Sequence, residues 1–86
     1  MVDYELIYEK AENKVLLQAE RRNLTTGDVQ IILDNCKMSY ASNILRRLYF
    51  KQFLRRKKIK QGFGGGIKYK YILTKKGEEK IRCLKE

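Results

Sequence analysis

The stretch that decides the fold is SYASNILRRL, residues 39–48. Its apolar side chains recur at steps of three and four residues, as they do on one face of a helix: Ala41, Ile44, Leu45 and Leu48. Ser39 is a suitable N-cap, so we expect a helix over residues 39–52. The sides of this helix away from its apolar face carry mostly polar and basic residues: Ser39, Tyr40, Ser42, Asn43, Arg46 and Arg47.

Two further helices are predicted before this one. From Tyr4 to Arg22 apolar residues recur at helical spacing without Gly or Pro, which predicts an amphipathic helix over residues 4–22. Leu6 and Leu17 fall outside its main apolar stripe and could pack against a neighbouring element or form a dimer contact. Thr25 is suited to cap a short helix over residues 25–34.

After Leu54 the pattern changes from helical to alternating. Apolar and basic residues alternate from Ile67 to Leu73, which is typical of a β-strand. A basic segment precedes this strand, and the glycine-rich GFGGG at 62–66 separates the two, so the sequence predicts a β-hairpin over residues 54–73. The alternation favours Tyr69 and Tyr71 as core residues over base-stacking residues. Thr74 would then cap a closing helix over residues 75–84.

Positive charge is concentrated in one part of the chain. Twenty Lys and Arg against ten Asp and Glu leave a net charge of +10. Residues 37–76 hold thirteen of the basic side chains and no acidic one, whereas residues 1–36 hold four basic and seven acidic side chains. A solvated surface normally mixes both signs. The forty residues without a carboxylate therefore favour a surface that binds a polyanion, with nucleic acid as the expected partner.

Other counts exclude several classes of protein. A chain of 86 residues can fill one core, so we expect a single domain over residues 1–86. There is no His, and Cys36 and Cys83 form no CxxC pair, so no metal site, cofactor or catalytic site is predicted. The glycine-rich segment matches neither a P-loop nor a dinucleotide fingerprint. No apolar run approaches the roughly 18 residues of a membrane span, so we expect a cytoplasmic, nucleoid-associated protein without a membrane partner.

The sequence resembles the winged helix-turn-helix transcription regulators of the MarR and PadR kinds. The resemblance is carried by residues 39–48, the pair Phe53-Leu54 and the run YILTKKGE at 71–78. The similarity spans roughly residues 24–84, and its most specific piece is the Tyr-x-Leu-Thr-x-x-Gly-Glu pattern. The resemblance implies an α+β winged helix, with a three-helix helix-turn-helix core, a two-stranded β-hairpin wing and a C-terminal helix. A Gly that commonly follows the recognition helix of these families is Gln52 here.

The resemblance also implies that helix 39–52 enters the DNA major groove and that the wing lies along the backbone or the minor groove. Carried over by position, the recognition helix supplies Ser39, Tyr40, Ser42, Asn43, Arg46 and Arg47. The wing supplies Arg56, Lys57, Lys58, Lys60, Lys68 and Lys70. Phosphate contact is favoured for the lysines, because Lys is a compact point charge. Base reading suits the helix, since Arg can bond two acceptors of guanine and Asn can pair with adenine.

The leading hypothesis is therefore a double-stranded DNA-binding transcription regulator, paired as a homodimer through its N-terminal and C-terminal helices. One alternative is a non-specific architectural or replication-associated DNA binder that uses the same charged surface without reading bases. The other is a winged-helix module that binds protein or structured RNA, since a fold alone does not assign a function.

Overall fold

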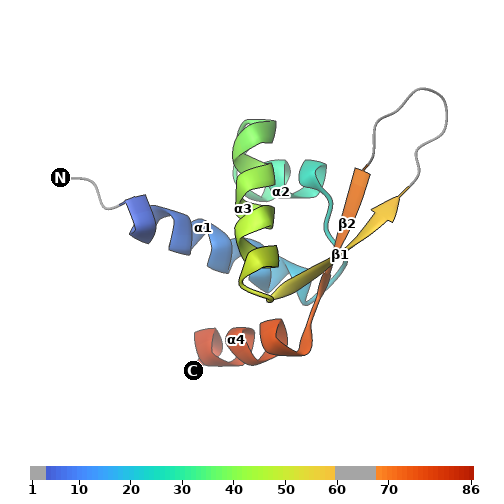
Figure 1. Ribbon diagram of the computed structural model, residues 1–86. Helices are drawn as coiled ribbons and strands as arrows, with labels where there is room; N and C mark the ends of the chain where they lie inside the picture. Colours follow the sequence, from blue (N-terminus) through green and yellow to red (C-terminus); the bar gives the residue numbers. More distant parts are fainter. Residues whose placement is uncertain (1–3, 60–67) are drawn as a thin grey trace.

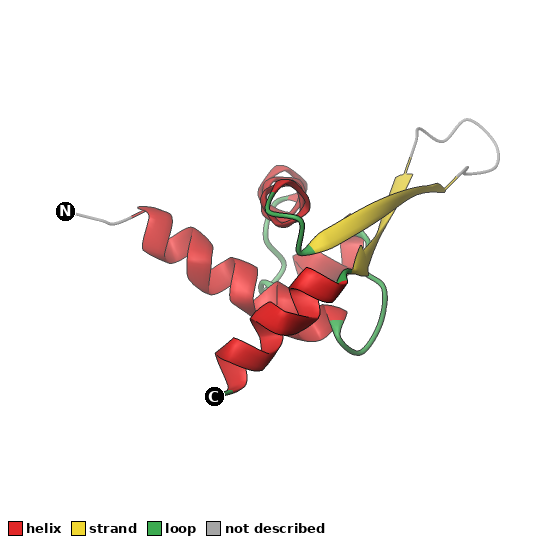
Figure 2. Ribbon diagram, turned by 60° about the horizontal axis from the view of Figure 1, so that its bottom comes forward, coloured by secondary structure: helices red, strands yellow, loops and turns green. Residues whose placement is uncertain are grey.

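The computed structural model describes residues 4–59 and 68–86 (Figure 1). Its elements, in chain order, are α1 (Tyr4–Ala19), α2 (Thr26–Ile32), α3 (Met38–Phe50), β1 (Leu54–Ile59), β2 (Lys68–Leu73) and α4 (Lys75–Lys85). The predicted α+β arrangement of three helices, a two-stranded hairpin and a closing helix is confirmed. The strands extend away from the helices, and α4 begins at the base of the hairpin and runs away from it (Figure 2). The predicted glycine tip lies outside the described residues.

The hydrophobic core lies where the first three helices meet the base of the hairpin. The predicted apolar face of α3 is buried in full: Ala41, Ile44, Leu45 and Leu48. From α1 the core takes Val15, Leu16 and Ala19, while Tyr71 enters from β2. Tyr71 is thus a core residue as predicted, and Tyr69 is half-buried against the same cluster.

The first two helices are shorter than predicted. α1 ends at Ala19 and not at residue 22, because the chain tightens there into a turn in which the Arg21 amide donates to the Gln18 carbonyl at 3.1 Å. In α2 Thr25 is the N-cap, as predicted, and forms a reciprocal capping box with Asp28. The helix ends at Ile32 and not at residue 34, since Asp34 and Asn35 have φ of 59° and 61°. Short polar side chains tolerate this left-handed backbone better than most.

Both ends of α3 also differ from the predicted range of 39–52. The helix begins at Met38 with Lys37 as its N-cap, so Ser39 lies inside the first turn and does not cap it. The Ala41 amide donates to the Lys37 carbonyl at 3.1 Å, which starts the helix earlier than expected. The helix ends at Phe50 and not at residue 52, because Gln52 has a φ of 68°. Gln52 thus adopts the left-handed conformation that a Gly would adopt without steric cost.

The hairpin is held to the helices by one additional backbone pair. β1 and β2 are antiparallel, with a register from Leu54 opposite Leu73 to Ile59 opposite Lys68. The Leu24 amide donates to the Tyr71 carbonyl at 2.9 Å, and the Tyr71 amide donates back at 2.7 Å. The segment between α1 and α2 is thereby fixed to β2. A single pair of residues has no periodicity, so the sequence pattern did not indicate it.

The Thr-x-x-Gly part of the YILTKKGE run joins α4 to the turn between α3 and β1. The Thr74 hydroxyl donates to the Gln52 carbonyl at 2.6 Å and accepts from the Gly77 amide at 3.0 Å. A Cβ atom at position 77 would lie 2.2 Å from the Phe53 carbonyl oxygen, so only Gly fits this close approach. The Gly of the Tyr-x-Leu-Thr-x-x-Gly-Glu pattern is therefore required here for steric reasons.

Candidate nucleic-acid interface

α3 presents different chemistry on each of its sides. Its apolar side faces the core, and a second side, with Tyr40, Arg47 and Lys51, faces α1. The remaining side faces solvent and the hairpin. It carries four of the six predicted recognition residues, of which Ser42 is half-buried and the others are exposed: Ser39, Ser42, Asn43 and Arg46.

Arg47 is engaged by acidic residues of α1. Its Nε lies 2.5 Å from Glu12 Oε1, and its Nη2 lies 3.0 Å from Glu5 Oε2. Lys51 Nζ approaches the other Glu12 oxygen at 2.8 Å, and Glu12 itself is only 3% exposed. The hydrogen bond to Glu12 raises the pKa of Arg47 above its ordinary value, so the guanidinium stays charged. We therefore assign Arg47 to the packing of α3 against α1 and not to the free basic surface.

Tyr40 is also turned toward α1. Its ring stacks on that of Tyr8, with centroids 6.0 Å apart, and the Arg47 guanidinium lies 4.7 Å above the Tyr8 ring. Burial raises the pKa of the Tyr40 hydroxyl. Of the predicted recognition residues, Tyr40 and Arg47 thus lie against α1, and Arg47 also lines one hollow together with the exposed Asn43 and Arg46.

Phe50 extends the exposed side of α3 and was not predicted from the sequence as part of it. It is 72% exposed. With Ser39, Asn43 and Arg46 it falls at steps of four, three and four residues, which places all four on one side of the helix. Extending that spacing beyond Arg46 could have found it. With Asn43, Arg46 and Arg47 it also lines a hollow beside Tyr8.

The hairpin carries different cations on its two faces. Cross-strand pairing places Arg56 and Lys58 on the face shared with Tyr69 and Tyr71. On the other face Lys57 lies directly opposite Lys70, although like charges in such a pair repel. Of the predicted wing residues, Arg56, Lys57, Lys58 and Lys68 are exposed, and Lys70 is half-buried. Lys60 lies outside the described residues.

A groove of about 540 Å³ lies between α3 and the hairpin. It brings together Arg46 from α3, Arg56 from β1 and Lys68 from β2. None of the described residues that line it is acidic: Thr26, Gly27, Gln30, Met38, Ser42, Arg46, Arg56, Lys68, Tyr69 and Tyr71. The groove therefore combines three cations, which only donate hydrogen bonds, with hydroxyl groups, and this suits a ligand rich in hydrogen-bond acceptors.

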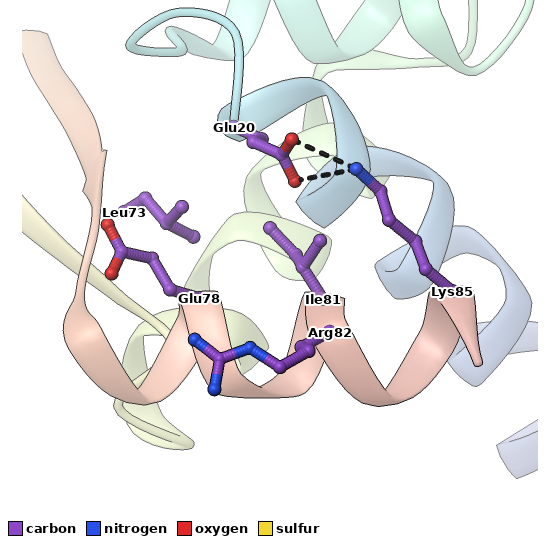
Figure 3. Close-up of a pocket in the computed structure, with 6 residues that line it drawn as sticks. All are labelled: Glu20, Leu73, Glu78, Ile81, Arg82 and Lys85. Carbon is purple, nitrogen blue, oxygen red and sulfur yellow. Dashed lines mark hydrogen bonds and ion pairs between the residues drawn. The ribbon is translucent and has the colours of Figure 1, made fainter.

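A second cavity, beside α4, has balanced charge (Figure 3). It is lined by Glu20, Leu73, Glu78, Ile81, Arg82 and Lys85. Lys85 Nζ lies 3.0 and 3.1 Å from the two Glu20 oxygens, which ties α4 to the end of α1. Because its acids offset its cations, this cavity offers little attraction to a polyanion. The excess positive charge lies instead around α3 and the hairpin.

Within residues 4–59 and 68–86 no cluster of three or more Asp, Glu, His and Cys side chains is arranged to hold a metal ion. None of the helices in that part of the chain is long and apolar enough to cross a membrane.

Two solved structures have the same arrangement of elements. A PadR family transcription regulator from hypervirulent Clostridium difficile R20291 superposes with a TM-score of 0.71 over 87% of this chain and 82% of its own, at 16% identity. Bacillus subtilis PadR in complex with operator DNA superposes with a TM-score of 0.74 over 85% of this chain, at 19% identity. This chain has the winged-helix fold. The match covers 45% of the Bacillus protein. The sequence matches no known protein family and no curated protein.

In this winged helix the hairpin of β1 and β2 is the wing, and α3 is the helix that directly precedes it. The described residues that sequence reasoning missed near the interface are Glu12, Tyr49 and Phe50. Glu12 could have been suspected, because one helical turn places it beside the apolar residues Tyr8, Val15 and Leu16. No sequence pattern indicated Tyr49, whose ring contacts the guanidinium of Arg56 in the wing.

Proposed function

We propose that this protein is a double-stranded DNA-binding transcription regulator that places α3 in the major groove and its wing on the backbone or the minor groove. One observation supports this proposal most. The exposed side of α3 borders the groove beside the hairpin, and none of the described residues that line this groove is acidic. A helix fits the major groove, where side chains can read the edges of bases. The similar Bacillus protein was solved with operator DNA. The role is one of binding and not of catalysis.

Within this proposal Asn43 and Arg46 are the base-reading residues, because both are exposed and their side chains can form paired hydrogen bonds with adenine and guanine. Ser39 and Ser42 contact the bases or backbone beside them. The wing binds phosphates through Lys57, Lys58, Lys68 and Lys70, together with Lys60 by its place in the sequence. Tyr40 and Arg47 support α3 from α1.

We further propose that two copies pair through α1 and α4, so that two copies of α3 read two half-sites of one operator. Ile7 and Leu17 on α1 are 46% and 36% exposed, which leaves apolar surface for such a contact. Pairing would also raise the affinity of a short domain that has one reading helix. The expected location is the cytoplasm, on the chromosome. Sedimentation equilibrium should give a mass of twice 10.3 kDa, and a monomer at all concentrations would contradict the pairing.

The test of the proposed function compares two adjacent arginines. Arg46→Ala and Arg47→Ala make the same change in charge, but only Arg46 is exposed and without an acidic partner among the described residues. We expect Arg46→Ala to weaken binding to an operator selected from a random pool by about 1–3 kcal/mol, the usual value of one paired base contact. Arg47→Ala should chiefly lower the unfolding midpoint. Fluorescence anisotropy and thermal melts measure the two effects.

Three probes separate the alternatives: random duplex, single-stranded DNA and an RNA hairpin. A random duplex bound within a few-fold of the selected operator would favour a non-specific architectural binder. Preference for the RNA hairpin would favour the RNA module. No binding of a folded protein to any probe at low salt would reject the proposed function.

A further inference from the structure

Arg56 is held between two aromatic rings. Its guanidinium carbon lies 4.3 Å from the centroid of Tyr49, on α3, and 4.5 Å from that of Tyr69, on β2. A guanidinium is attracted to the face of an aromatic ring and stacks on it with its flat side. The two rings come from different elements, so their contacts orient the guanidinium and link α3 to the wing. We call this arrangement the tyrosine clamp: Arg56, Tyr49 and Tyr69.

The tyrosine clamp opens into the groove between α3 and the wing. Arg56 and Tyr69 line that groove together with Arg46, Lys68 and Ser42. No described ion pair includes Arg56, whereas Arg47 and Lys51 are paired with acids of α1. Three cations without a described carboxylate repel one another in the free protein, so a bound anion would relieve that repulsion.

The groove discriminates between the two parts of DNA that could enter it. The edge of a base presents donors as well as acceptors, whereas a phosphodiester presents only acceptor oxygens. The charged groups that the wing supplies to the groove, Arg56 and Lys68, only donate hydrogen bonds, and the fork of an arginine matches two phosphate oxygens at once. A phosphodiester is therefore the better match.

We propose that Arg56, oriented by Tyr49 and Tyr69, anchors a single backbone phosphodiester of duplex DNA by two parallel hydrogen bonds in this groove. The inference rests on the proposed function and assigns one residue within it a role that differs from that of the wing lysines. Those lysines act as mobile point charges, whereas Arg56 acts through a fixed geometry. Its charge alone is then insufficient, and Lys cannot replace it.

The test uses duplex binding by fluorescence anisotropy over a series of salt concentrations. Arg56→Lys keeps the charge but removes the planar fork, so we expect about tenfold weaker binding with an unchanged dependence of log Kd on log salt. Arg56→Gln should weaken binding and also lower the salt slope by roughly one. Tyr49→Leu keeps the arginine but opens the clamp, and should weaken binding about threefold at an unchanged slope. Arg55→Lys is the matched control, because Arg55 is exposed and lies on the opposite face of the wing.

Each outcome bears on the proposal. Weakening by Arg56→Lys beside an unaffected Arg55→Lys supports the clamp, provided that both variants melt as the wild type does. Binding by Arg56→Lys at wild-type strength overturns the clamp while the proposed function stands. Equal weakening by both lysine variants also overturns it, since the requirement would then not be local to the groove. Failure of the wild type itself to bind duplex rejects the proposed function, and the clamp with it. If Tyr49→Leu does not fold, the comparison of Arg56 with Arg55 still decides.

Discussion

The buried carboxylate of Glu12 gives the sharpest test of how α3 is held. We consider Glu12→Gln, which keeps the size of the side chain and removes its charge. The wild-type carboxylate accepts from Arg47 and from Lys51 at 2.5 and 2.8 Å. A hydrogen bond to a charged group contributes about 1.5–3 kcal/mol. The side chains of Arg47 and Lys51 are 30% and 45% exposed, so in the variant water replaces part of the hydrogen bonding that they lose. The amide oxygen of the introduced Gln still accepts one hydrogen bond.

The net loss of unfolding free energy should then be about 2 kcal/mol, near the value of one such bond. In a domain of this size each kcal/mol moves the melting midpoint by roughly 4–8 °C, so we expect a fall of about 8–16 °C. Thermal unfolding followed by circular dichroism measures it. Glu9→Gln is the control, because Glu9 is exposed on the same helix and the change in net charge is identical. Such a surface change should stay within about 0.5 kcal/mol. Equal melting midpoints for the two variants would refute the argument that Glu12 anchors α3.

Two other comparisons follow from the geometry. Gly77→Ala places a Cβ 2.2 Å from the Phe53 carbonyl and should cost about 2–3 kcal/mol, whereas Gly27→Ala meets nothing closer than 3.8 Å and should be neutral or slightly stabilising. Urea unfolding of the two variants checks this, and similar effects would contradict the steric explanation. Lys57→Glu turns the repulsive pair with Lys70 into an attractive one, so stability should rise by about 0.2–1 kcal/mol. The same change should weaken duplex binding and lower the salt slope by about two. A loss of stability would show that the two lysines do not repel in the folded protein.

Helical spacing and strand alternation were sufficient to predict the architecture. The inward side of α3 was predicted residue by residue, because burial follows the 3.6-residue period of the backbone. The ends of the elements were less accurate, since they depend on single backbone conformations. Gln52 is the clearest case. It lies two residues after the end of α3 and has a positive φ, which prevents the helix from continuing to residue 52 as predicted.

The direction of long side chains could not be predicted in the same way. Spacing places Arg47 one turn after Asn43 on a polar part of α3. Its guanidinium nevertheless reaches Glu12, which is 35 positions away in the chain. The sum of charges over residues 37–76 therefore overstated the free basic surface, because Arg47 and Lys51 are paired across elements. Pairing of this kind depends on the three-dimensional packing of α1 against α3, which a count along the chain does not contain.

The bridge between Leu24 and Tyr71 also bears on how the protein avoids aggregation. A two-stranded sheet has two open edges, and an open edge can pair with a strand of another molecule. The bridge occupies part of the free edge of β2. The other edge belongs to β1, in which four successive residues, 55–58, are basic. A second copy of this strand would bring like charges together, so the basic residues of β1 oppose pairing of its free edge with another molecule.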